Sequence, residues 1–343
     1  MPKAWPLISV ITPTLNAGNV LETELDSIAM QDYPQGKIEI IIADGGSTDN
    51  TLQIAKNYNA KVYQNPLKTG EAGKAVAVKK AKGKYIALID SDNILPNENW
   101  LKEMISPLES DSNLVGSEPW AFTYRKDAGF IERYCSLIGA NDPIILWYKN
   151  YDRLNVVSNT WTESNITQKD KVDYIEVTLE KGREIPTIGA NGTIFRSNFL
   201  QNANIGDYLF DIDILLSQVN RIGEVKFAKV KTSIIHTYCE DNIKKFARKQ
   251  KRRVLDYYYY KSLGLRDTEW ESKSSKYTIL KFAVETALII PNLFYAIRGY
   301  LKKQDTAWFF HPVACLITLY QYAIGTISFK AKKVTINRDD WKQ

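Results

Sequence analysis

Asp90 and Asp92 lie two residues apart, directly after the apolar run 85–89. A short apolar run of this kind is typical of a buried strand, so both carboxylates are expected at its carboxyl end. Hard oxygen ligands suit Mg²⁺ or Mn²⁺, and open α/β sheets bind their ligands outside the carboxyl ends of the strands. Because an Asp-x-Asp also occurs in polar turns, the surrounding elements must decide what this pair does.

The elements before Asp90 alternate between short Ile- and Val-rich runs and segments with helical character. The second predicted helix starts after Asp49 or Ser47 as its N-cap. Such an alternation predicts an α/β fold with a doubly wound, mostly parallel sheet flanked by helices. The predicted elements are strand 7–11, helix 20–30, strand 38–43, helix 51–58, strand 61–63, helix 72–82 and strand 85–89.

Three blocks in this region, 10–16, 43–51 and 89–92, resemble the signature of family 2 glycosyltransferases with the GT-A fold, in that family's order and spacing. The resemblance implies that Asp90 and Asp92 hold the diphosphate of a nucleotide sugar through Mn²⁺ or Mg²⁺. It also assigns a set of residues to the nucleotide and donor side: Thr12, Pro13, Thr14, Asn16, Asp44, Gly45, Ser47, Asp49 and Ser91.

Competing phosphate-binding motifs do not match. No G-x-G-x-x-G follows the first strand, and residues 70–75 have the wrong spacing for a P-loop, with Ala75 where a metal-binding Ser or Thr belongs. Lys74 in this segment either faces the donor phosphates or is a solvated helix lysine.

The middle of the chain is expected to bind the acceptor. Gly189, Ala190, Asn191 and Gly192 resemble the family's acceptor-side loop, where small residues let backbone amides approach a substrate. Further on, the family has an acidic pair whose second residue is the base of inverting transfer. Phe210 and Asp211 match that pair with Phe in place of the first acid, so Asp211 is the expected base and Asp213 the alternative.

Two further positions match the family in part. His236 ends the apolar run 232–235, where related transferases have a third metal ligand. Residues 250–254 resemble the Q-x-x-R-W motif of processive members, which assigns Gln250 and Arg253 to the acceptor side. Val254 replaces the Trp, which argues against a processive polymerase.

Charge is unevenly distributed. Residues 241–343 contain 20 Lys and Arg against 9 Asp and Glu, whereas the whole chain carries a formal net charge of only +6. A basic segment can bind nucleic acid or an anionic membrane. Because this segment is also apolar, we expect a membrane partner and no nucleic acid. The three cysteines lie far apart without metal-ligand spacing, which favours a reducing compartment.

Two apolar segments, 282–300 and 307–329, carry the membrane prediction. The second has 23 residues without an acid, Lys or Arg, enough to cross a bilayer core of ~30 Å. Because Pro291 and Pro312 can break these helices, a pair that lies in the membrane plane or re-enters it is as compatible with the sequence as a pair that spans the membrane. The expected domains are a GT-A catalytic domain 1–240 (donor half 1–116, acceptor half 117–240), a basic and aromatic linker 241–275, two apolar membrane-associated helices 276–330 and a polar tail 331–343. A chain cut after Lys273 is expected to fold by itself.

Together these patterns predict an inverting, metal-dependent glycosyltransferase at the cytoplasmic face of the cell membrane. The donor is a UDP- or GDP-linked sugar, and the acceptor is a hydroxyl or phosphate, on a lipid-linked sugar or polyprenyl phosphate. Two alternatives stay open: a catalytically silent nucleotide-sugar-binding membrane scaffold, and a sugar-nucleotide pyrophosphorylase.

Overall fold

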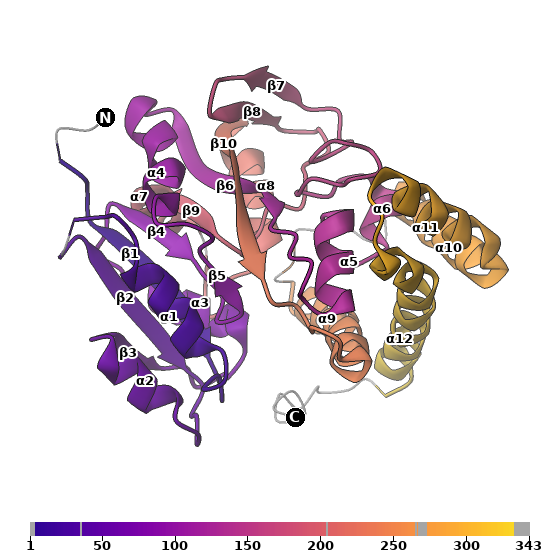
Figure 1. Cartoon of the computed structure of the whole chain (residues 1–343), viewed down its shortest axis with the longest axis horizontal. Helices are drawn as coiled ribbons and strands as arrows, with labels where there is room; N and C mark the ends of the chain where they lie inside the picture. Colours follow the sequence, from indigo (N-terminus) through magenta and orange to yellow (C-terminus); the bar gives the residue numbers. More distant parts are fainter. Residues whose placement is uncertain (1–3, 35, 204, 265, 267–272, 333–343) are drawn as a thin grey trace. The chain divides into compact units, whose positions relative to one another are not determined.

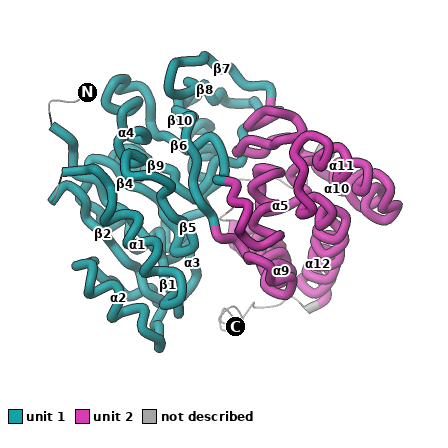
Figure 2. Tube along the Cα trace, viewed as in Figure 1, with its two compact units in different colours: residues 1–123, 165–236 teal, residues 124–164, 237–343 magenta. Residues whose placement is uncertain are grey.

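The computed structural model describes residues 4–34, 36–203, 205–264, 266 and 273–332. They form two compact units, one made of residues 1–123 and 165–236 and the other of residues 124–164 and 237–343 (Figure 2). The first unit therefore ends near the domain boundary expected at 240. Residues 124–164, expected in the acceptor half, belong to the second unit instead.

The first unit is a sheet with interspersed helices, as Figure 1 shows. The predicted strands and helices up to residue 89 are all present, with bounds that differ by a few residues. The elements are β1 (Ile8–Thr14), α1 (Leu21–Ala29), β2 (Ile38–Asp44), α2 (Thr51–Asn57), β3 (Lys61–Gln64), α3 (Gly70–Val78), β4 (Tyr85–Leu88), β5 (Asn93–Ile94), α4 (Trp100–Ser110), β6 (Leu114–Phe122), β7 (Thr167–Asp170), β8 (Tyr174–Glu180), β9 (Thr193–Arg196), α7 (Ser197–Gln201), α8 (Asp211–Ile222) and β10 (Glu224–His236).

The sheet has the strand order β3-β2-β1-β4-β9-β6-β10-β8-β7, and β5 pairs with β10. Its first four strands are parallel, as the alternation of strands and helices predicts. β9 then runs antiparallel to both β4 and β6, and β8 runs antiparallel to β10. β10 is again parallel to β6, so the sheet is mixed, with its parallel pairs concentrated in the N-terminal part of the unit.

The apolar faces of these elements meet in one core. Strand residues such as Ile8, Val10 and Ile42 are fully buried among apolar residues of α1 and α4. α3 packs on β1 and β2, and α4 packs on β6 and β10. Burial on both faces explains why the central strands read as nearly continuous apolar runs. It also fixes the strand ends, where the polar residues lie.

The second unit is helical in its described residues. Its helices are α5 (Phe130–Ile138), α6 (Ile145–Tyr148), α9 (Ile243–Ser262), α10 (Lys273–Leu288), α11 (Ile290–Lys302), the 3₁₀ helix η1 (Thr306–Phe310) and α12 (His311–Lys332). Tyr134 and Leu137 of α5 share a buried cluster with Trp308 and Phe310, which is why residues 124–164 group with the C-terminal helices. The indole of Trp308 lies against Gly299, where an added Cβ would approach it to 2.4 Å.

The basic segment expected to be a linker is largely the long helix α9, whose Phe246, Val254 and Tyr257 are buried. The predicted apolar segment 282–300 is two helices, α10 and α11, that meet at a bend of 85°. One helix, Thr306–Ala331, is long and apolar enough to cross a membrane by length and composition, and 22% of its most apolar window is buried. The predicted tail lies outside the described residues from 333 onward.

Candidate active site

The ends of β1 and β2 shape the first part of the site. Thr14 and Asp44 are register partners at the ends of these strands, and the Thr14 hydroxyl donates to Asp44 Oδ1 at 2.9 Å. Asp44 also accepts from the amides of Gly46 and Ser47, both at 2.8 Å, and from the Ser47 hydroxyl. These four donors occupy the acceptor positions of a carboxylate that is only 5% exposed. Asp44 therefore holds the turn after β2, and its assignment to the nucleotide side stays a prediction.

The loops after β1 and β2 are bonded to each other. The Asn16 amide donates to Ser47 Oγ at 2.8 Å, and the Thr48 amide donates to Asn16 Oδ1 at 2.9 Å. Gly18 N–H donates to Asp49 Oδ2 at 3.0 Å. Asp49 does not cap α2 as its N-cap residue, which is Asn50. The two loops thus form one rigid edge of the site.

Asp49 also bonds within its own loop. Its Oδ1 accepts from the amide and the hydroxyl of Thr51, and the hydroxyl bond lowers the pKa of this exposed carboxyl.

Thr12, Pro13 and Gly45 are buried parts of the same edge. The Thr12 hydroxyl donates to Glu24 Oε1 at 2.6 Å, while Glu24 Oε2 is buried without a hydrogen-bond partner. Burial raises the pKa of Glu24 well above its ordinary value. Pro13 lies against α3, where an added Cβ on Gly73 would come within 2.7 Å of it. Glu24 could not be predicted from the sequence, because its position resembles an ordinary helix surface.

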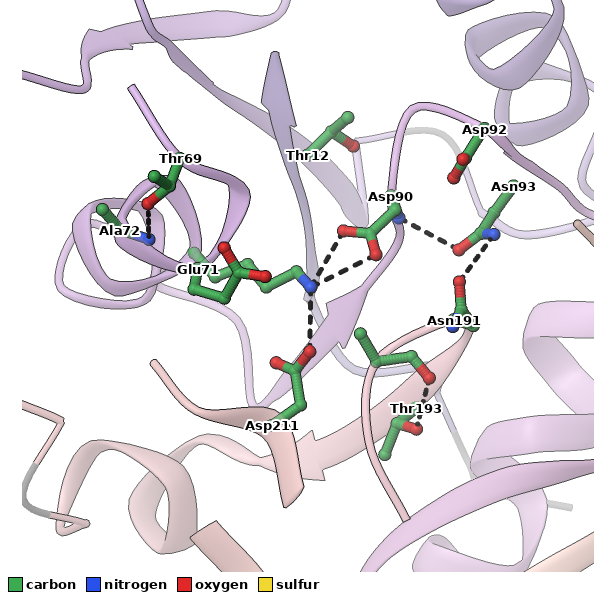
Figure 3. Close-up of polar contacts among 12 residues, drawn as sticks. Thr12, Thr69, Glu71, Ala72, Asp90, Asp92, Asn93, Asn191, Thr193 and Asp211 are labelled. Atoms are coloured by element: carbon green, nitrogen blue, oxygen red, sulfur yellow. Dashed lines mark hydrogen bonds and ion pairs between the residues drawn. The ribbon is translucent and has the colours of Figure 1, made fainter. Parts of the chain in front are cut away.

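Lys74 contacts both Asp90 and Asp211, two of the residues labelled in Figure 3. It lies on α3, whose N-cap Thr69 accepts from the Ala72 amide, and it is only 3% exposed. Its ammonium bonds Asp90 Oδ1 at 3.0 Å and Asp211 Oδ2 at 3.0 Å. Burial lowers the pKa of Lys74, but Asp211 and Asp90 more than compensate and raise it above its ordinary value. The solvated lysine considered as an alternative is therefore wrong.

Asp211 begins α8 and points into this cluster (Figure 3). Its Oδ2 bonds Lys74, whereas its Oδ1 is buried without a hydrogen-bond partner. Burial raises its pKa to about 6; Lys74 opposes the rise, and Asp90 and Glu71 add to it. Asp213 lies about 200° further around the helix, so it cannot share this position. Of the two candidates, Asp211 has the surroundings of a general base.

The Asp90–Asp92 turn is connected to the acceptor-side loop through Asn93. The Asp90 amide donates to Asn93 Oδ1 at 3.0 Å, and Asn93 Nδ2 donates to Asn191 Oδ1 at 3.0 Å (Figure 3). Asn191 and Gly192 both have positive φ, 58° and 91°. Asn93 is fully buried, and its place directly after Asp92 was the available signal for it.

A buried ion pair contacts the same loop through Glu118. Glu118 on β6 and Lys229 on β10 are register partners, both fully buried, and their charged atoms are in contact. Glu118 Oε1 also lies 3.4 Å from the Gly189 amide and 3.3 Å from the Thr193 hydroxyl, both donors. Thr193 donates as well to the carbonyl of Ala190 at 3.2 Å. A Cβ on Gly189 would lie 3.3 Å from that of Asp211, so this glycine allows loop and base to approach closely.

Two of the three expected metal ligands, Asp92 and His236, lie close together. β5 pairs with the end of β10, so that Asn93 and His236 are register partners. His236 Nε2 lies 3.4 Å from Asp92 Oδ1. Neighbouring ligand atoms on one octahedral cation are about 3 Å apart, so this pair fits a divalent ion. Asp90 is bound to Lys74 instead, and Ser91 between the carboxylates is half-buried. Across the described residues, no three His, Cys, Asp or Glu side chains gather into a complete metal site.

Gln250 and Arg253 belong to the second unit, on α9. Gln250 Nε2 and Arg253 Nη1 both donate to the carbonyl of Asn141, at 3.1 and 2.9 Å. Gln250 is fully buried. In this unit the two side chains hold the loop after α5.

The mannosyltransferase PcManGT from Pyrobaculum calidifontis, solved with GDP-Man and Mn²⁺, has the same fold. It is similar over 94% of this chain and 88% of that chain, with a TM-score of 0.50 and 15% sequence identity. The mixed sheet, with strand-end carboxylates beside a buried lysine, is of the GT-A fold type.

Residues 9–169 match the model of Glycosyl transferase family 2. It is 40% identical over 101 residues to the poly(ribitol-phosphate) beta-N-acetylglucosaminyltransferase TarS of Staphylococcus aureus, covering 28% of this chain and 18% of that protein. It is 27% identical over 143 residues to the glycosyltransferase AglE of Haloferax volcanii, covering 40% and 46%. The chain thus spans less than half the length of these two relatives.

Proposed function

We propose that this protein transfers a sugar from a UDP- or GDP-linked donor to an acceptor hydroxyl, with inversion at the anomeric carbon. The observation that carries the proposal is the Asp211 carboxylate, which lies half-buried beside Lys74 and keeps one buried oxygen without a partner among the described residues. A buried base of raised pKa at the carboxyl end of the sheet is the group that such a transfer needs.

In the proposed reaction the acceptor oxygen attacks the anomeric carbon while Asp211 Oδ1 takes the hydroxyl proton. The bond from that carbon to the diphosphate breaks, and the nucleoside diphosphate leaves with the bonding electrons. Lys74 lies next to Asp90, so its ammonium can meet the departing phosphate charge. Asp92 and His236, together with Asp90, would hold a divalent cation, which would neutralise further charge on the departing diphosphate. One displacement at one carbon inverts its configuration.

We further propose that the acceptor is lipid-linked and that the protein works at the cytoplasmic face of the cell membrane. The support is the net positive charge of residues 241–343 and the exposed apolar side chains of the C-terminal helices. Anionic headgroups attract such a surface, and attachment concentrates enzyme and lipid acceptor in two dimensions.

The test is product analysis with the full chain. A panel of UDP- and GDP-sugars, Mn²⁺ and membrane lipid is incubated with the protein, and the lipid extract and nucleotides are measured by mass spectrometry. Glycosylated lipid with free nucleoside diphosphate is expected. Donor binding without turnover would point to a silent scaffold, and pyrophosphate as a substrate or product to a pyrophosphorylase.

Asp211→Asn provides the residue-level test. It is expected to retain donor binding and to lose about 10²–10⁴-fold in turnover, as for the loss of a general base. Asp213→Asn is the matched variant, two residues along the same helix, and should keep most of its turnover. An active Asp211→Asn protein beside an inactive Asp213→Asn protein would reverse the assignment.

A further inference from the structure

The large apolar side chains exposed on the second unit are concentrated on α10, α11 and α12. Leu301 is 77% exposed, Ile290 75% and Tyr277 70%. Water-facing helices normally turn polar residues outward. Others on these helices include Leu280, Leu288, Leu293, Phe294 and Tyr320.

The polarity of α11 is inverted. Its buried residues are Asn292, Ala296 and Gly299. Leu293 and Phe294 lie on its exposed side instead. Small and polar residues therefore face the protein while the largest apolar side chains face outward, an arrangement that is stable only against an apolar surrounding.

α10 and α11 are too short to cross a membrane one by one. They contain 16 and 13 residues and are separated by Ile289, which has φ of 63°, with a bend of 85°. At 1.5 Å per residue their lengths are about 24 and 20 Å, below the ~30 Å of a bilayer core. A sharp bend at this depth would also leave free backbone groups in hydrocarbon.

α12 is long enough, but its neighbour prevents it from crossing. It packs along α9: the Phe329 ring stacks on Tyr258 at 5.3 Å, and Gly325 lies directly against Val254. Further along, the Tyr322 hydroxyl donates to Asp142, which lies 3.5 Å from Arg253.

α9 is strongly basic over residues 244–253. Its basic residues there are Lys244, Lys245, Arg248, Lys249, Lys251, Arg252 and Arg253. A bilayer that enclosed α12 would enclose this charged helix as well, which the cost of burying charge in lipid forbids.

We propose that the second unit lies in a single leaflet, with α10, α11 and the outer side of α12 against the lipid and no segment of 273–332 crossing. This rests on the membrane location proposed above and specifies its geometry. The exposed face is suited to lipid because aromatic rings at Tyr277, Phe294 and Tyr320 accompany exposed lysines such as Lys276 and Lys281. Amphipathic rings and long basic side chains are the residues that settle at a membrane interface.

The decisive experiment labels both ends of the long apolar helix in sealed vesicles of phosphatidylcholine and phosphatidylglycerol. Thr306→Cys and Lys330→Cys are made separately in the full chain, because both positions are exposed. The native Cys135, Cys239 and Cys315 are buried, and the parent protein gives their background. A membrane-impermeant maleimide added outside should label both variants. Labelling at one end only, with the other end appearing after detergent, would overturn the proposal.

A second measurement identifies the lipid-facing surface. The double variant Phe294→Asp, Leu301→Asp should bind these vesicles about tenfold more weakly in flotation. Val172→Asp is the control, because Val172 is 89% exposed at the β7–β8 turn and should bind normally. A wild-type protein that does not float with the vesicles would refute lipid as the partner of this face. A dimer in sedimentation that covers Phe294 and Leu301 would refute it as well. The Asp211→Asn protein should dock like wild type, so a failure of catalysis and a failure of docking are distinguishable.

Discussion

Asp211 and Lys74 show how one contact sets the chemistry of two residues. Burial raises the pKa of the Asp211 carboxyl above that of a free aspartate, and the Lys74 charge partly offsets this rise. The same ammonium holds Asp90, so base and donor side are connected through a single side chain. Changes in charge at any of the three should therefore appear at the other two.

The first prediction concerns the pH dependence of transfer. Asp211 must be ionised to accept a proton, and its pKa is raised to about 6. We expect kcat/KM to rise with pH through about 6 and to level off above it. A pH–rate profile measures this limb. A rate that stays constant down to about pH 4, where an ordinary aspartate titrates, would contradict the assignment.

The second prediction concerns Lys74. Lys74→Met should reduce turnover by about 10²-fold, because it removes a buried donor at the departing charge. It should also move the acid limb of the pH profile upward, because Asp211 loses the charge that lowers its pKa. Lys80→Met is the control, since Lys80 is exposed near the end of the same helix. An unchanged limb in Lys74→Met would show that Lys74 does not act on the base.

The third prediction concerns Glu24 and stability. Burial raises the pKa of Glu24 above its ordinary 4.5, so the folded protein keeps a proton that the unfolded chain releases as pH rises. This carboxyl thus lowers stability above the unfolded pKa. Glu24→Gln should raise the Tm at pH 8 and leave it unchanged at about pH 4. Exposed Glu22→Gln on the same helix should show no such pH dependence.

At the scale of elements, the N-terminal half of the sheet could be predicted because its strands are short apolar runs between turn residues. The strand ends then placed Asp92 and His236 close together. The place of Asn93 directly after Asp92 was a signal for it, whereas Glu118 could not be found in this way, because it acts through a partner distant in sequence. The contacts of Asp44 could not be predicted for a related reason: only the folded loop shows which donors reach its carboxylate.

The fourth prediction tests the pair that joins β6 to β10. Lys229→Met should lower the free energy of unfolding by about 3–5 kcal/mol, because it leaves Glu118 buried without its counter-ion. Lys226→Met on the same strand is the control. Lys226 is 36% exposed and forms only a surface pair with Glu176, so its loss should cost less than about 1 kcal/mol. Chemical denaturation measures both, and equal losses would contradict the role of burial.

At the scale of the whole molecule, the division into units differs from the linear domains that the sequence suggested. The second unit draws on two separate stretches, and α5 shares its buried cluster with η1 and α12. A pattern of local periodicity contains no information on which distant helix completes a core. The prediction that a chain cut after Lys273 folds by itself stays a prediction, and the buried cluster shared by α5, η1 and α12 argues against it for the second unit.

The fifth prediction concerns the same truncated chain and expects that its helical part does not fold. A chain ending at Lys273 loses Trp308, Phe310 and Ala314, the partners of Tyr134 and Leu137. We expect the fragment to expose this apolar surface, to bind a hydrophobic dye and to be cleaved by protease within 124–164. The uncut chain is the control. A fragment that unfolds in one cooperative step, without dye binding, would refute the role of these contacts.

The discontinuous second unit also has a consequence for synthesis. During translation α5 emerges well before η1 and α12, an interval on the order of ten seconds at ordinary rates of elongation. Over that time its apolar side has no partner to cover it, although β1 to β4 can already pair with one another. The parallel half of the sheet should therefore assemble first and the helical unit last. The lipid-facing surface would then exist only after α12 has been made, so attachment to a membrane would follow translation rather than accompany it.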